Sequence, residues 1–164
     1  MSAEICGARA LADRLEARKG RPARERVVQD VEIPLEATAA FLRWFLREVP
    51  IEPIWLCPLR LRRAAPTDNG QWPLYPLAPD RLYVNVGFWS TVPIAEGDVE
   101  GDVNRRIEAK VAELDGHKSL YSDAYYGPEE FWQLYGHAQY ERAKAHYDPD
   151  GRLLDLYDKA VRRR

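Results

Sequence analysis

The chain has 164 residues, 46% of them hydrophobic, with 24 lysines and arginines against 26 aspartates and glutamates. This length and composition predict one globular domain with a sizeable core. The net charge of -2 gives no broad positive field, which argues against nucleic acid as a partner. No run approaches the ~18 apolar residues of a transmembrane helix, and the N-terminus lacks an apolar signal core. The sequence therefore predicts a cytoplasmic protein without a transmembrane segment.

Residues 1–25 are predicted to be a leader and linker, because a short helical pattern decays there into a basic stretch broken by Gly and Pro. Residues 26–33, RVVQDVEI, alternate β-branched with polar side chains and predict the first strand. This alternation places Asp30 and Glu32 on the face opposite to the neighbouring aliphatic residues. A helix is predicted over 35–49, where apolar residues recur at helical spacing.

Residues 51–61, IEPIWLCPLRL, predict a second strand at the edge of a sheet, because their prolines cannot donate to a sheet ladder. A long proline-rich segment follows, which we interpret as a functional flap or a mobile loop. A third strand is predicted over 81–89, a helix over 99–114 and a fourth strand over 117–126. A helix that begins at Pro128 and a last short helix close the chain.

The predicted order, β-α-β-β-α-β followed by two helices, is the ferredoxin-like pattern. The sequence thus predicts an α+β fold in which an antiparallel sheet carries both crossover helices on one face. The opposite face of the sheet must then be covered by something else or be used.

Strand alternation assigns each side chain of the sheet to one of its two faces. The predicted helix-facing side chains are Leu82, Val84, Val86, Phe88, Leu120 and Ala124. The predicted open-face side chains are Tyr83, Asn85, Gly87, Trp89, Ser119, Tyr121, Asp123 and Tyr125. In the second strand, either Trp55 and Cys57 or Ile54 and Leu56 face that side. Such an aromatic and polar face is typical of a site for a flat, partly polar ligand, the alternative being packing against another domain or subunit.

Few other residues suggest chemistry. The two cysteines, Cys6 and Cys57, are predicted to be reduced thiols. The three histidines show no metal-ligand spacing and are each predicted to lie at the surface, so no metal site is expected: His117, His137 and His146. Asp123, beside two tyrosines, is a candidate acid or base, the alternative being a structural hydrogen-bond partner.

Five segments, in this order, resemble flavin-linked oxidoreductases of the vanillyl-alcohol-oxidase superfamily, most closely the delta-24-sterol reductase (seladin) group. They are VVQDVEIP (27–34), PIWLCP (53–58), LYVNVGFW (82–89), LYSDAYYGPEEFW (120–132) and YDPDGRLLDLYDKAV (147–161). The resemblance implies that residues 26–164 are a C-terminal cap domain, whose sheet closes over the flavin ring and forms one side of the substrate pocket. It also implies hydride transfer from a reduced pyridine nucleotide such as NADPH, through FAD, to a carbon-carbon double bond of a lipid-like or sterol-like substrate.

The family's N-terminal FAD-binding domain has no counterpart in residues 1–25. We therefore expect this chain to share FAD with a flavin-binding domain or subunit and to be inactive alone, and the complete enzyme to be cytoplasmic or peripheral to a membrane. The site residues expected on this basis are Tyr121 and Asp123 for catalysis, Asn85, Tyr125 and Cys57 for the cofactor, and Trp55, Tyr83 and Trp89 for the substrate. The alternative is a stand-alone ferredoxin-like interaction or ligand-binding module, and a homo-oligomer that hides the same surface is also left open.

Overall fold

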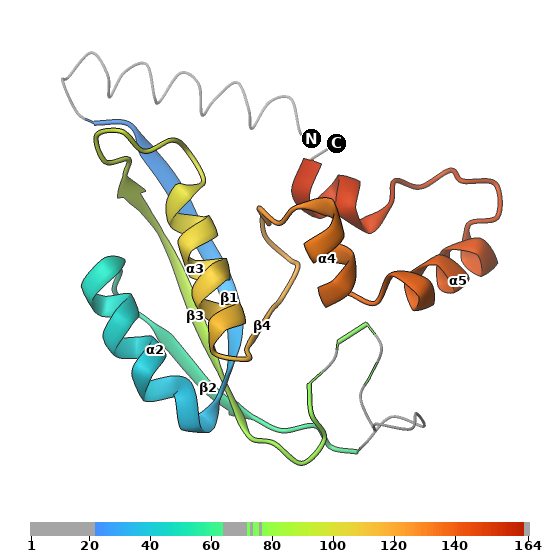
Figure 1. Cartoon of the computed structure of the whole chain (residues 1–164), viewed down its shortest axis with the longest axis horizontal. Coiled ribbons are helices and arrows are strands. Elements are labelled where there is room, and N and C mark those ends of the chain that lie inside the picture. The colour runs from blue at the N-terminus through green and yellow to red at the C-terminus, as the bar shows by residue number, and fades with distance from the viewer. Residues whose placement is uncertain (1–21, 64–71, 73, 76, 163–164) are drawn as a thin grey trace.

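The computed structural model describes residues 22–63, 72, 74–75 and 77–162. Residues 1–21 of the predicted leader, and several residues of the proline-rich segment, lie outside this part. The strands are β1 (Arg24–Pro34), β2 (Trp55–Leu59), β3 (Tyr83–Pro93) and β4 (His117–Lys118) (Figure 1). The helices are α2 (Leu35–Glu48), α3 (Asp102–Glu113), α4 (Pro128–Leu134), α5 (His137–Tyr147) and a π-helical turn over Asp158–Arg162.

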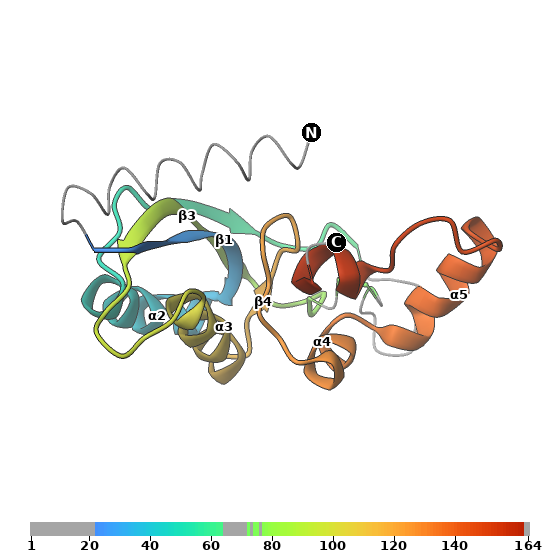
Figure 2. The same cartoon turned by 90° about the horizontal axis from the view of Figure 1, so that it is seen from above.

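The four strands form one antiparallel sheet in the order β2-β3-β1-β4. The central strands β1 and β3 are paired along their full length, from Arg24 opposite Pro93 to Pro34 opposite Tyr83. The proline-containing β2 lies at the edge, as its sequence predicts. Figure 2 shows α2 and α3 together on one side of the sheet. The predicted α+β fold, with a four-stranded antiparallel sheet and further C-terminal helices, is confirmed.

The main core lies between the sheet and these two helices. Val84, Val86 and Phe88 of β3 are buried there, as the alternation predicts, whereas Leu82 precedes the strand and is exposed. Phe45 of α2 packs on Phe88 with ring centroids 4.4 Å apart. Each such side chain contributes roughly 1.5 to 3 kcal/mol through burial. This core fixes which face of the sheet remains open.

The predicted fourth strand is wrong beyond its first two residues. Only His117 and Lys118 pair with β1, and one further hydrogen bond joins the Ser119 amide to the Asp30 carbonyl at 3.0 Å. The following segment leaves the sheet because its backbone finds other partners. The Ala124 amide donates to the Ala160 carbonyl at 2.9 Å, so Ala124 packs among the C-terminal helices and not against α2 and α3.

A second, aromatic core holds the C-terminal part of the chain, which lies beside the sheet in both views (Figures 1 and 2). Its buried members are Ala124, Tyr126, Phe131, Tyr135, Tyr157 and Ala160. The predicted helix from Pro128 is divided into α4 and α5 at Gly136, whose φ of 62° favours glycine.

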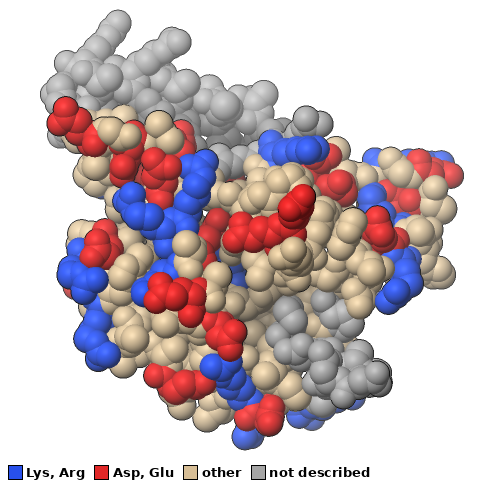
Figure 3. Space-filling view, in the orientation of Figure 1, with Lys and Arg blue, Asp and Glu red and all other residues tan. Residues whose placement is uncertain are grey.

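The helix-covered side of the molecule shows acidic and basic side chains interspersed (Figure 3). Large single-sign patches would favour charged polymers as partners, and Figure 3 shows none among the described residues of this side. Within the described residues, no helix combines the length and apolarity needed to cross a bilayer.

Candidate functional site: the open face of the sheet

The open face is the side of the sheet turned away from α2 and α3. Cross-strand partners point to the same face, and the register pairs Gly87 of β3 with both Asp30 and Trp55. The next row pairs Asn85 with Glu32 of β1 and Cys57 of β2. Of the two orientations left open for the second strand, the structure therefore has Trp55 and Cys57 on the open face.

One half of the open face is a buried polar cluster around Glu32, which is 1% exposed. Its Oε1 accepts hydrogen bonds from Asn85 Nδ2 at 2.8 Å and from Ser119 Oγ at 3.1 Å. Its Oε2 is buried and has no hydrogen-bond partner among the described residues. Burial raises the pKa of Glu32, and the hydrogen bond from Asn85 opposes this rise.

His117 belongs to the same cluster, so its predicted surface position is wrong. The β4 register places it opposite Glu32, and its ring lies 4.8 Å from that of Tyr75 and 5.1 Å from that of Tyr135. Burial lowers the pKa of His117 to about 4, because the charged form would lose its water. The imidazole is therefore neutral at pH 7. The predicted surface positions of His137 and His146 are confirmed.

The other half of the open face is an aromatic cluster around Asp30. Trp89 Nε1 donates a hydrogen bond to the Tyr121 hydroxyl at 3.1 Å, and both side chains are about half exposed. Asp30 itself is partly exposed, but its Oδ1 is buried and has no partner among the described residues. Burial raises the pKa of Asp30, and a hydrogen bond with Tyr121 opposes this rise. The cluster thus holds a carboxyl group with one buried oxygen that has no hydrogen-bond partner among the described residues.

Gly87 makes room for that carboxyl group. A Cβ atom at Gly87 would lie 2.2 Å from Asp30 Oδ1 and 3.2 Å from the Trp89 ring. The Asp30 side chain therefore lies across β3 in the space that a side chain would otherwise fill. Only glycine allows this arrangement in the present geometry.

Five predicted site residues lie exposed or half-buried on the open face: Trp55, Cys57, Asn85, Trp89 and Tyr121. Tyr83 shares this face but is buried, and its hydroxyl accepts a hydrogen bond from the Ala78 amide at 3.1 Å. The assignment of Tyr125 to the open face is wrong. Its ring lies against Gly101 at the start of α3 and 5.3 Å from the Arg105 guanidinium, because the chain has left the sheet before this residue.

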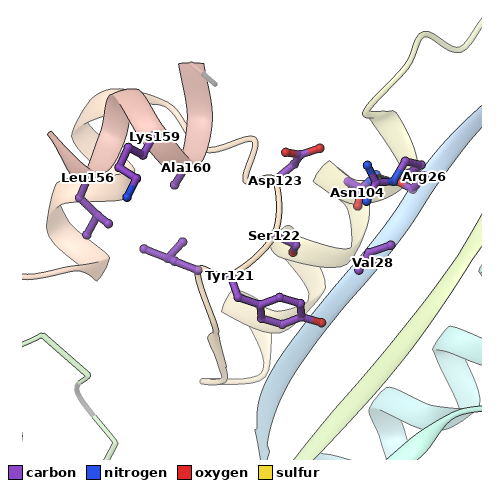
Figure 4. Close-up of a pocket in the computed structure, with 10 residues that line it drawn as sticks. Arg26, Val28, Asn104, Tyr121, Ser122, Asp123, Leu156, Lys159 and Ala160 are labelled. Carbon is purple, nitrogen blue, oxygen red and sulfur yellow. Dashed lines mark hydrogen bonds between the residues drawn. The ribbon is translucent and has the colours of Figure 1, made fainter. Parts of the chain in front are cut away.

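Asp123 is likewise not on the open face. It lines a cleft of about 490 Å³ between β1, α3 and the C-terminal helical turn (Figure 4). Arg26 and Asn104 line one side of this cleft, and Lys159 lines the other. Tyr121 lines the same cleft, so it connects the cleft to the aromatic cluster.

Sequence reasoning missed the two carboxylates as site residues. Alternation had placed Asp30 and Glu32 opposite the aliphatic residues of their strand, and this pair of acidic residues on one face was the available signal. Tyr75 and His117 carried no such signal, because their positions depend on how the chain leaves the sheet. The described residues contain no group of three side chains that could hold a metal ion.

A flat ring with polar edges, such as the flavin implied by the resemblance, fits the chemistry of this face. Gly87 contributes no side chain to this face; Trp55 lies beside it on β2, Trp89 lies two residues along β3, and both tryptophans are exposed. The unpartnered Oδ1 of Asp30 marks a place where the polar complement of the site is incomplete.

Comparison with known proteins identifies relatives of this chain. No family model and no solved structure matches the chain. The delta(24)-sterol reductases of rat and human are 28% and 27% identical over 134 residues, which cover 81% of this chain and 25% of each relative. A delta(24)-sterol reductase homologue from Caenorhabditis elegans is 30% identical over 139 residues, or 85% of this chain and 25% of the relative.

The chain spans about a quarter of the length of these curated relatives. That coverage is consistent with a C-terminal part of such a protein. The predicted resemblance is confirmed: over four-fifths of its length, this chain is homologous to part of the delta(24)-sterol reductases.

Proposed function

We propose that this chain is the substrate-side cap of a FAD-dependent reductase of the delta(24)-sterol reductase type, acting with a flavin-binding domain or subunit. The observation that carries the proposal is the open face, where aromatic side chains surround a carboxyl group with an unpartnered oxygen. A face that only contacts solvent does not need such residues, and a structural core would pair the carboxyl group.

The exposure of the aromatic residues supports a partner on this face. Trp55 is 57% exposed, Tyr121 54% and Trp89 51%. Large aromatic side chains that gather on one surface are typical of interfaces and ligand sites, because burying them there gives a large free-energy gain. The flavin-binding domain and a lipid-like or sterol-like substrate together are the proposed occupants.

In the proposed enzyme, FAD supplies the hydride, which it obtains from a reduced pyridine nucleotide such as NADPH. The residues of this chain bind and orient the ligand, and they exclude water from it. Trp55 and Trp89 provide apolar walls for a flat or lipid-like ligand. Tyr121 and Asn85 provide hydrogen-bonding groups that stay uncharged near neutral pH, and Cys57 lies beside Asn85 at the edge.

The first test asks whether the chain needs a partner. The isolated chain is titrated with FAD and its visible spectrum is recorded. We expect no stable yellow complex. Tight stoichiometric binding of FAD by the chain alone would contradict the assignment as a cap and favour a stand-alone ligand-binding module.

The second test is a chimera in which this chain replaces the matched quarter of the rat enzyme. We expect a protein that retains FAD and reduces the carbon-carbon double bond of a delta(24)-sterol. Tyr121→Phe should lower kcat by roughly tenfold, since one oriented hydrogen bond contributes about 1 to 2 kcal/mol. Tyr147→Phe, at a tyrosine that is 83% exposed at the end of α5, is the matched control. A folded chimera that binds FAD but never reduces the sterol would contradict the proposal.

A further inference from the structure

We propose that Asp30 is the acid that donates the proton to the double bond, and that Tyr121 positions its carboxyl group. This inference rests on the proposed reductase function and deepens it. It concerns only residues of this chain, and its first test needs no cofactor.

The position of Asp30 is the first argument. Asp30 lies in the same row of the sheet as Gly87 and Trp55, in the middle of the open face. Its carboxyl group occupies the space above Gly87, which no other residue type would leave free. A ligand that contacts Trp55 and Trp89 on the open face would therefore lie near this carboxyl group.

The hydrogen-bonding state of Asp30 is the second argument. Its Oδ1 is buried without a donor, and no ion pair joins Asp30 to a cation among the described residues. Burial of a carboxyl oxygen that has no donor disfavours the charged form of the group. Because the residue is nevertheless partly exposed, a ligand on the open face can approach it.

The charged groups around Asp30 do not oppose this effect of burial. The titratable and charged side chains around the open face are Arg26 and Glu32 of β1, Cys57 of β2, Tyr83 of β3, His117 of β4, and Tyr75, Arg81 and Tyr121 from the adjoining segments. Arg26 lies four residues away along β1, and Arg81 pairs with Glu36 and Asp115. The carboxyl group nearest along the strand is Glu32, which disfavours a second negative charge beside it. A covering domain would remove water and strengthen this preference.

The other acidic groups near the open face fit this role less well. Glu32 has a raised pKa, but it is 1% exposed and its Oε1 is held by Asn85 and Ser119. The pKa of the Tyr121 phenol is raised above its ordinary value of 10.0 by burial, which makes it a poorer proton donor. Asp123 lies in the cleft. Among these carboxyl groups, only that of Asp30 combines a raised pKa with partial exposure on the open face.

The proposed step is balanced. One alkene carbon receives the hydride, with its two electrons, that a reduced flavin supplies. The other carbon takes the carboxyl proton of Asp30 through the π electron pair of the double bond. Two carbon-hydrogen bonds form, the flavin is oxidised and Asp30 is left as a carboxylate, which regains a proton from solvent after the product leaves.

The first experiment uses the isolated chain and no flavin. The Asp30 carboxyl carbon is titrated by NMR, together with the indole N–H resonance of Trp89, which reaches Asp30 through Tyr121. We expect Asp30 to titrate above the ordinary aspartate value of 3.8. Tyr121→Phe should raise the midpoint further, because its hydrogen bond opposes the rise, and Asp30→Asn should abolish the matching shift of Trp89. A midpoint at or below 3.8 would overturn the inference.

The second experiment uses the chimera with the rat enzyme. Asp30→Asn should lower kcat by roughly 10²- to 10³-fold and remove the loss of activity that the wild type shows as pH rises through the Asp30 midpoint, with FAD content and sterol binding unchanged. The control is Asp150→Asn, which removes an exposed aspartate paired with Arg152. If Asp30→Asn keeps the wild-type rate and pH profile, the inference falls and the cap assignment stands. If the folded wild-type chimera is itself inactive, both fall.

Discussion

On the helix-covered face of the sheet, Glu108 of α3 lies 2.6 Å from Lys118 of β4, and both side chains are buried. Glu25 on the same face accepts hydrogen bonds from the backbone amides of Gly101 and Asn104 at 2.6 and 3.2 Å. On the open face, by contrast, Asp30 and Glu32 each keep an oxygen without a partner. Strand β1 thus carries a paired carboxylate, Glu25, on one side and two under-paired ones, Asp30 and Glu32, on the other.

The difference separates structural from ligand-facing carboxylates. Leaving a buried oxygen without a donor costs free energy. The helix-covered face avoids this cost because α3 brings its own donors to Glu25, and Lys118 pairs with Glu108. The open face lacks such an element within the described residues, which is the expected state of a surface completed by a ligand or partner.

The largest expected effect comes from breaking the buried pair. Lys118→Met removes the cation that faces Glu108 and should lower the free energy of unfolding by about 3 to 5 kcal/mol, because a buried charge is left unpaired. Urea denaturation measures the change. Arg47→Met, which removes an exposed pair with Glu48, should cost at most about 1 kcal/mol. Equal costs for the two variants would contradict the structural role of the buried pair.

The next effect concerns pH and the open face. His117 has a pKa of about 4 in the folded chain against 6.5 when unfolded, so the unfolded chain binds more protons between these values. Stability should therefore rise with pH from 4 to 6.5, by on the order of 3 kcal/mol at about 1.4 kcal/mol per pH unit. His117→Phe should remove this contribution. Denaturation of both proteins at several pH values gives the difference, and an unchanged pH dependence would show that His117 is not buried.

A smaller effect on stability is expected at Gly87, beside the Asp30 carboxyl group. Gly87→Ala should cost about 1 to 2 kcal/mol, because the new methyl group displaces the Asp30 carboxyl group. The displaced group gains water, so its pKa should return toward 3.8 in an NMR titration. Gly127→Ala is the control, since nothing lies within 4 Å of a Cβ atom there. An unchanged Asp30 titration in Gly87→Ala would refute the proposed crowding.

The smallest effect on stability is expected at Trp55. In the isolated chain, Trp55→Ala should change the free energy of unfolding by no more than about 0.5 kcal/mol, because the side chain is exposed on an edge strand. Phe88→Ala, on the opposite face, should cost about 3 to 5 kcal/mol. In the chimera, Trp55→Ala should instead weaken sterol binding. A large loss of stability at Trp55 would mean that this tryptophan supports the fold.

Much of the fold could be predicted from local patterns. Alternation in β1 and β3 assigned Val84, Val86 and Phe88 to the core and Asn85 and Trp89 to the open face, because a residue's face in a strand depends only on its position in a period of two. The prolines of residues 51–61 predicted the edge position of β2, because proline has no N–H group to donate to a neighbouring strand.

The site was predictable only where its residues lie in paired strands. Tyr125 and Asp123 were misplaced because the alternation argument assumed that the strand continues. Their own backbone groups have other partners: the Tyr125 amide donates to Glu108 at 3.1 Å, and the Asp123 carbonyl accepts from the Lys118 ammonium at 2.7 Å. Glu108 lies 17 residues from Tyr125, on helix α3, and Lys118 reaches Asp123 only because the chain turns between them.

The sequence alone therefore determined the order of the elements, the two-faced strands and the resemblance to the sterol reductases, since all three are properties of neighbouring residues. The tertiary structure alone decided where the chain leaves the sheet after Lys118, that His117 is buried and that the Asp30 carboxyl group lies over Gly87. These features depend on competition among hydrogen-bond partners and on space between strands, which appear only when residues far apart in the chain are brought together.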